Sequence, residues 1–134
     1  MDLSKLDIKE AADQGAEMVL RHPNTDEILY TDDKPIVFEL LGADSTEYRR
    51  RLRMAGNKNI SKGRKGQTVE KLEAETVDLL AACTVNWTGV VLDGETLEFS
   101  FQAAKQLYGD ERFRWIYDQV DEFIGERSNF LSNV

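Results

Sequence analysis

Cysteine, histidine and proline are scarce in this sequence: its 134 residues include one cysteine, one histidine and two prolines. Because a disulfide needs two cysteines, Cys83 cannot form one within the chain. Cys83 and His22 together cannot supply the four ligands of a structural zinc site. The sequence has neither a low-complexity composition nor a repeat of fixed period. We therefore expect a fold that is held by a hydrophobic core, without a disulfide or a metal.

Long apolar runs are also missing. No segment approaches the roughly 20 consecutive apolar residues that span a bilayer, and residues 1–10 alternate in charge where a signal peptide would be apolar. We therefore expect a cytoplasmic protein with no membrane contact. Hydrophobic residues make up 41% of the chain, which is enough for one core at this length. The sequence predicts a single domain over residues 1–134.

Charge is distributed unevenly along the chain. The whole sequence has 25 acidic and 17 basic residues, a formal net charge of -8. Residues 48–69 contain eight of the basic residues and no acidic one, so the rest of the chain has 9 basic against 25 acidic residues, a net charge of -16. The eight basic residues are Arg49, Arg50, Arg51, Arg53, Lys58, Lys62, Arg64 and Lys65. The sequence thus describes an acidic domain with one basic segment.

The first part of the chain predicts a small sheet. Residues 3–14 have only a weak apolar pattern, which we interpret as a loosely attached arm or a short helix. Three β-branched and aromatic runs within residues 16–42 predict a three-stranded antiparallel meander, and such a small sheet needs a helical layer on one face. We therefore predict the α+β class, with a small N-terminal antiparallel β-meander followed by a mainly α-helical C-terminal body.

The basic segment divides into a predicted helix and a predicted linker. Asp44 precedes Glu47 by three residues, which is typical of a helix start, so we expect a basic helix over residues 45–55. Residues 56–67 contain three glycines and almost no apolar residue, which predicts a flexible basic linker. Thr68 can cap the helix that follows.

Residues 68–131 predict the helical body. The helix after Thr68 has one apolar stripe that we expect to be buried. The members of this stripe are Val69, Leu72, Thr76, Leu79, Leu80 and Cys83. Further on, Asp93-Gly94 favours a two-residue hairpin turn, although an irregular loop fits the surrounding residues equally well.

Two more helices are predicted towards the end of the chain, because Ser100 can cap residues 101–108 and Asp110 can cap residues 111–127. The apolar stripe of the second helix consists of Phe113, Ile116, Tyr117, Val120, Phe123 and Ile124. At 100° per residue, Trp115 projects away from this stripe. Trp115 is either covered by another element of the chain, such as the 101–108 helix, or an anchor for a partner, because tryptophan is enriched among interface hot spots.

No set of residues in the sequence predicts catalysis. Asp118, Asp121 and Glu122 share the polar face of the last helix, but no histidine accompanies them. His22 precedes a proline in a predicted turn and has no nucleophile motif around it. Cys83 lies on an apolar stripe, where cysteine acts as a small hydrophobic side chain. We therefore expect a protein that is not an enzyme and that has no cofactor.

The basic segment and Trp115 are the candidates for binding a partner. The segment could bind nucleic acid through phosphate contacts, or an acidic protein surface, including that of a second copy of this chain. No aromatic residue is interleaved for base stacking and the acidic remainder would repel a polyanion, so a protein partner is favoured. A homo-oligomer formed in this way would loosen as salt rises. The candidate partner-binding residues are Trp115, Arg49, Arg50, Arg53, Lys62, Arg64 and Lys65.

The C-terminal half carries an ordered set of motifs. They are the runs LLAACTVNWTG at 79–89, LEFS at 97–100, LY at 107–108, WIYDQV at 115–120, FI at 123–124, Arg127, and NFL at 129–131. In order and spacing this set resembles the tail assembly chaperones of long-tailed bacteriophages and prophages. The predicted meander, with LLG at 40–42 and Tyr48-Arg49, resembles that family more loosely.

The resemblance implies a non-enzymatic role in tail morphogenesis. Members of the family are described as coating or escorting the tape measure protein, as recruiting tail tube subunits, and as absent from the finished virion. We therefore expect a chaperone in the host cytoplasm with the tape measure and tail tube proteins as partners. The alternative is a small phage regulatory protein that binds nucleic acid or a host protein through residues 49–65.

Overall fold

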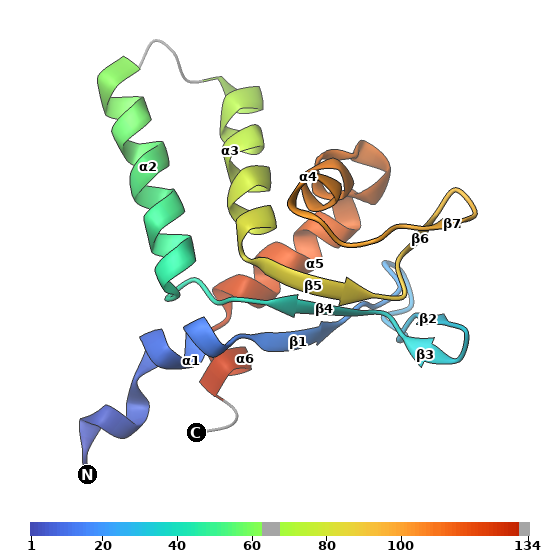
Figure 1. Cartoon of the computed structure of the whole chain (residues 1–134), viewed down its shortest axis with the longest axis horizontal. Helices are drawn as coiled ribbons and strands as arrows, with labels where there is room; N and C mark the ends of the chain where they lie inside the picture. The colour runs from blue at the N-terminus through green and yellow to red at the C-terminus, as the bar shows by residue number, and fades with distance from the viewer. Residues whose placement is uncertain (63–67, 132–134) are drawn as a thin grey trace.

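The computed structural model describes residues 1–62 and 68–131, the segment 57–62 by its backbone alone. A three-stranded antiparallel sheet crosses the middle of the fold (Figure 1). Its strands are β1 (Ala16–Val19), β4 (Val37–Leu40) and β5 (Thr84–Thr88), in the order β1-β4-β5. Met18 of β1 pairs with Phe38 of β4, and Phe38 pairs with Trp87 of β5. Residues paired directly across a sheet share a face, and all three side chains are buried.

The predicted meander over residues 16–42 is wrong in its middle strand. Tyr30–Thr31 (β2) and Lys34–Pro35 (β3) pair with each other as a separate two-stranded hairpin. Asp32 and Asp33, which lie between them, have positive φ angles of 51° and 66°, the geometry of a tight type I′ turn. β4 instead lies beside β1, and its other neighbour is β5, from the segment predicted as the helical body.

Helices pack on the buried face of the sheet and extend beyond it (Figure 1). In chain order they are the 3₁₀ helix η1 (Leu3–Leu6), α1 (Ile8–Gln14), α2 (Thr46–Lys62), α3 (Val69–Ala82), α4 (Phe101–Gly109), the 3₁₀ helix η3 (Glu111–Phe113), α5 (Arg114–Gly125) and α6 (Ser128–Leu131). After β5, β6 (Val91–Leu92) and β7 (Glu95–Thr96) form a short hairpin with Asp93-Gly94 at its turn, which confirms the hairpin alternative. The combination of a small antiparallel sheet and packed helices confirms the α+β class.

Side-chain caps begin two helices where the sequence predicts them. The Thr68 and Ser100 hydroxyls accept hydrogen bonds of 3.2 and 3.0 Å from the backbone N–H of the third residue of α3 and of α4. The predicted helix over 111–127 is wrong at its start, because Asp110 caps the 3₁₀ turn η3 and the α-helix begins at Arg114. Local capping chemistry therefore marks where a helical turn begins but does not fix its hydrogen-bond pattern.

α2 is longer than the sequence predicts. The basic helix predicted over 45–55 continues to Lys62, so the predicted flexible linker is wrong over residues 56–62. A glycine inside a helix costs about 1 kcal/mol relative to alanine, and helix propagation past a single such residue, Gly56, remains favourable because the nucleus has already formed. The rest of the predicted linker, residues 63–67, lies outside the described residues.

The predicted stripe of α3 is buried only in its C-terminal half. Leu80 and Cys83 are buried, whereas Val69 is 68% and Leu72 is 47% exposed. α2 and α3 rise side by side from the sheet, and the first turns of α3 stand clear of α4 and α5 (Figure 1). The periodicity identifies the correct face of the helix, but how much of that face the body covers is set by the tertiary structure.

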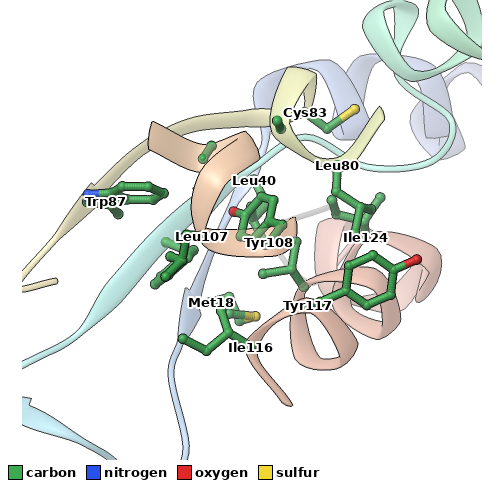
Figure 2. Packing of buried hydrophobic residues seen from close by; sticks show 14 of the residues in the cluster. Met18, Leu40, Leu80, Cys83, Trp87, Leu107, Tyr108, Ile116, Tyr117 and Ile124 are labelled. Carbon is green, nitrogen blue, oxygen red and sulfur yellow. The ribbon is translucent and has the colours of Figure 1, made fainter. Parts of the chain in front are cut away.

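The core joins the sheet to α3, α4 and α5. Figure 2 shows part of this cluster, with labels on Met18, Leu40, Leu80, Cys83, Trp87, Leu107, Tyr108, Ile116, Tyr117 and Ile124. The stripe predicted on the last helix is confirmed, since its members in α5 are buried or packed against the core. The Thr84 and Tyr108 hydroxyls, 2.8 Å apart, form a buried hydrogen bond.

The N-terminal residues are more firmly attached than a loose arm. Ala11 and Ala12 of α1 are buried, and α1 contacts α6. The arm interpretation fits only η1, where Leu3 and Leu6 are exposed.

Candidate protein-binding surfaces

Trp115 lies partly buried in a groove between α5 and the end of β1. The groove has a volume of about 690 Å³. We call it the Trp115 groove. Trp115, Gln119 and Phe123 of α5 line one wall, and Met18 and the 21–26 turn line the other. The predicted cover for Trp115, the 101–108 segment, supplies none of the residues that line this groove.

Hydrogen bonds hold the two walls of the Trp115 groove together. The Gln119 side-chain amide donates to Arg21 O (2.8 Å), and its carbonyl oxygen accepts from Arg21 N (3.1 Å). In the turn itself, His22 Nδ1 accepts from the backbone N–H groups of Asn24 (3.1 Å) and Thr25 (3.2 Å). This places His22 in a surface turn, as the sequence predicts, and gives the groove a preorganised shape.

The rim of the Trp115 groove is mainly acidic. Asp26, Asp118, Glu122 and Glu126 line it, against the single cation Arg21. An apolar floor with a tryptophan and an acidic rim suits an apolar segment that carries lysine or arginine, since a cation is attracted both to carboxylates and to the face of an indole ring.

The candidate arginines lie on a different surface, along α2. Arg49 lies 3.5 Å from Asp44, and Arg50 lies 2.7 Å from Glu47. Arg53 is exposed on the same helix. None of these three residues lines the Trp115 groove, so the structure does not bring them together with Trp115 in one site.

The basic segment also contains one arginine that joins α2 to the body, and three candidates whose side chains the structure does not describe. Arg51 was not a candidate, yet it joins α2 to the body: its guanidinium lies 3.0 Å from Asp78 of α3 and over the ring of Phe101. Lys62 is the last residue of α2, described by its backbone alone. Arg64 and Lys65 lie outside the described residues.

Sequence reasoning missed a second groove, between α2 and α3. It has a volume of about 710 Å³ and is lined by more apolar than polar surface. We call it the α2/α3 groove. Its apolar lining residues are Leu52, Met54, Ala55, Leu72, Ala74 and Leu79. Leu52 is 43% and Met54 45% exposed. The signal in the sequence was the presence of two large apolar residues inside an arginine-rich helix.

Of the residues weighed for catalysis, His22, Asp118 and Glu122 all line the Trp115 groove, whereas Cys83 lies in the core. Cys83 is buried, and the loss of solvent raises the pKa of its thiol to about 12, so it remains protonated. Asp118, Asp121 and Glu122 are exposed on α5, and the pKa of Asp121 is raised by partial burial and by the nearby Asp118. Within residues 1–62 and 68–131, no group of three or more His, Cys, Asp or Glu side chains could hold a metal ion.

Comparison with known proteins identifies no relative of this chain. No protein-family model, no curated protein sequence and no solved structure matches this chain. Among the helices that the structure describes, none has the length and apolarity to cross a bilayer.

Two carboxylates stabilise the start of α2 and make the stability of the fold depend on pH. Asp13 accepts hydrogen bonds from Thr46 N (2.7 Å) and Thr46 Oγ1 (3.0 Å), and Asp44 accepts from Arg127 Nε (2.7 Å) and Nη2 (3.1 Å). The Thr46 backbone N–H lowers the pKa of Asp13, and the Arg127 guanidinium lowers the pKa of Asp44. Both contacts therefore stabilise the fold most when the carboxyls are ionised.

We expect the melting temperature to fall as the pH drops below about 4, the ordinary pKa of aspartate. The pKa of each of these two carboxyls is lower in the folded chain than in the unfolded chain, so its ionised form stabilises the fold above the unfolded-state pKa. This contribution is lost as the pH falls through the folded-state pKa. Asp44→Asn should melt lower than wild type at pH 7, and the difference should shrink as the pH falls below about 4 and towards the lowered pKa of Asp44. Circular-dichroism melts over this range measure both. A difference that stays constant with pH would show that the charge of Asp44 contributes nothing.

Proposed function

We propose that this chain is a non-enzymatic tail assembly chaperone of a long-tailed bacteriophage or prophage, which binds the tape measure protein and tail tube protein in the host cytoplasm. The observation that carries the proposal is the ordered motif set over residues 79–131. Many of its residues are core residues of α3, β5, α4 and α5, so the resemblance concerns the framework of the fold. Trp115 and Gln119, from the same set, line the Trp115 groove.

The surface chemistry supports a role in binding protein. Two grooves with apolar floors lie on the body, one under Trp115 and one between α2 and α3. A tape measure protein presents long apolar helices that would aggregate alone, and an amphipathic helix can lay its apolar face into such a groove. Shielding apolar surface in this way requires no catalytic group.

Co-expression tests the proposal directly. The chain should be produced together with the long, helical tape measure protein of the phage or prophage that encodes it, and the soluble fraction of that protein and its recovery with the tagged chain should be measured. We expect both to increase relative to expression of the long protein alone. Production of an unrelated acidic protein of similar size from the same vector is the control. If the solubility and recovery of the long protein match that control, the proposal is wrong.

The alternative is a regulatory protein that uses α2 to bind nucleic acid. The observation in its favour is that Arg49, Arg50 and Arg53 lie exposed on one helix. An electrophoretic shift assay at low salt separates the two, because phosphate contacts are strongest there. A shift at low salt that disappears at moderate salt would support the alternative, and no shift at low salt removes it.

A further inference from the structure

The α2/α3 groove has apolar surface that the body does not cover. Leu52 and Met54 of α2 and Leu72 of α3 line it, and each is more than 40% exposed. The two helices rise together from the sheet, with α4 and α5 packed lower down (Figure 1). Exposed apolar residues that gather in one groove mark a contact surface, unlike the same residues scattered singly.

The two walls of the groove carry opposite charge. The part of α2 from Thr46 to Gly56 has four arginines and one glutamate, a net charge of +3. α3 has four acidic residues and one lysine, a net charge of -3. Near the groove, Arg50 Nη1 lies 3.7 Å from Met54 Sδ, and Glu75 of α3 is a lining residue. Among the charged residues that line the groove, α2 supplies Arg51 and α3 supplies Glu75 and Asp78, with Lys105 of α4 beside Asp78.

This pattern is self-complementary. When two copies meet about a twofold axis that runs along the helix pair, between α2 and α3, the basic α2 of each copy lies against the acidic α3 of the other, and both contacts form at once. A single foreign helix would instead need an acidic flank towards α2 and a basic flank towards α3. Two helix pairs that close over their apolar faces also produce the packing of a four-helix bundle.

We propose that the α2/α3 groove is the self-association surface of this chain, occupied by the α2/α3 helix pair of a second copy. The proposal goes beyond the chaperone function and does not depend on it, because self-association is measured without any tape measure protein. Leu52, Met54 and Leu72 become buried between the copies, and charges of opposite sign on α2 and α3 flank them.

Charge-reversal variants test whether α2 of one copy contacts α3 of the other copy. One variant, Arg50→Glu, places a carboxylate beside Met54 on the α2 wall, and a second variant, Glu75→Lys, places an ammonium group on the α3 wall. In sedimentation velocity at low salt we expect dimers for the wild type, and for each variant alone a dissociation constant at least about 10-fold higher, because like charges then face each other. An equimolar mixture of the two variants should recover the wild-type dimer, since only the mixed pair places opposite charges together. Each reversal changes the net charge by two, so the variants carry -10 and -6 from the -8 of the wild type, and general attraction cannot account for recovery.

The apolar part of the surface has a matched control. Leu72→Asp in the groove should abolish the dimer, whereas Val91→Asp on β6 should leave it intact, although Leu72 and Val91 are almost equally exposed, at 47% and 48%. Circular-dichroism spectra that match the wild type establish that each variant is folded. If the wild type sediments as a monomer at its highest soluble concentration, the proposal is wrong, and the occupant of the groove would then be a helix of another protein. Variants that dimerise like the wild type, or a mixture that stays monomeric, overturn it as well.

Discussion

Phe38→Ala is expected to lower the free energy of unfolding by about 3–5 kcal/mol, the usual cost of deleting a buried phenylalanine ring. Phe38 is fully buried on β4, the central strand of the sheet. Its ring centroid lies 5.4 Å from that of Trp87 on β5 and 6.4 Å from that of Tyr108 on α4. Because a domain of this size is stable by about 5–15 kcal/mol in total, the variant should be close to its unfolding threshold.

Urea denaturation followed by circular dichroism measures this loss. Val85→Ala on β5 is the control, because Val85 is 52% exposed and lies on a strand of the same sheet. We expect the control to change stability by no more than about 0.5 kcal/mol, as surface substitutions usually do. Equal losses in the two variants would show that the sheet, and not the packing of the Phe38 ring, determines the effect.

The importance of Phe38 also shows what the sequence could predict. Local signals are sufficient for caps and for the buried face of a helix, because those depend on residues within one or two turns: Ser100, Thr68 and the stripe of α5 are where they were predicted. Strand pairing is different, since β4 pairs with β5 across more than forty residues of chain. No local pattern in the 16–42 region indicates that the partner of Phe38 is Trp87.

The two candidate binding surfaces could also be predicted from the sequence only where they depend on local patterns. Helical periodicity predicted that Trp115 projects away from the core stripe of α5, whereas the structure packs it partly buried against the core. The second wall of its groove comes from β1 and the 21–26 turn, nearly a hundred residues earlier. The α2/α3 groove could not be predicted for a further reason. Its α2 wall is formed by residues within 51–56, almost all inside the predicted 45–55 helix, but no local pattern indicates that this helix lies beside α3.

Trp115→Ala is expected to weaken binding of the proposed tape measure partner by about 30-fold or more, the effect of losing an interface hot spot. The side chain is partly buried and packs at the edge of the core, so the variant should also lose about 1 kcal/mol of stability, less than the 3–5 kcal/mol of a fully buried tryptophan. Titration calorimetry with the purified partner and a thermal melt of the variant alone measure the two effects separately.

Tyr30→Ala is the matched control for Trp115→Ala. Tyr30 is a large exposed aromatic on β2, outside the Trp115 groove, so its truncation should change neither the affinity nor the melting temperature by a comparable amount. The loss of affinity in Trp115→Ala, compared with its loss of stability, decides the role of Trp115. A large loss of affinity with a small loss of stability identifies an anchor, because the Gln119 bridge to Arg21 still holds the groove together without the indole ring. A large loss of stability with unchanged affinity per folded molecule would identify Trp115 as part of the core, and the groove would then lack the anchor that the chaperone proposal assigns to it.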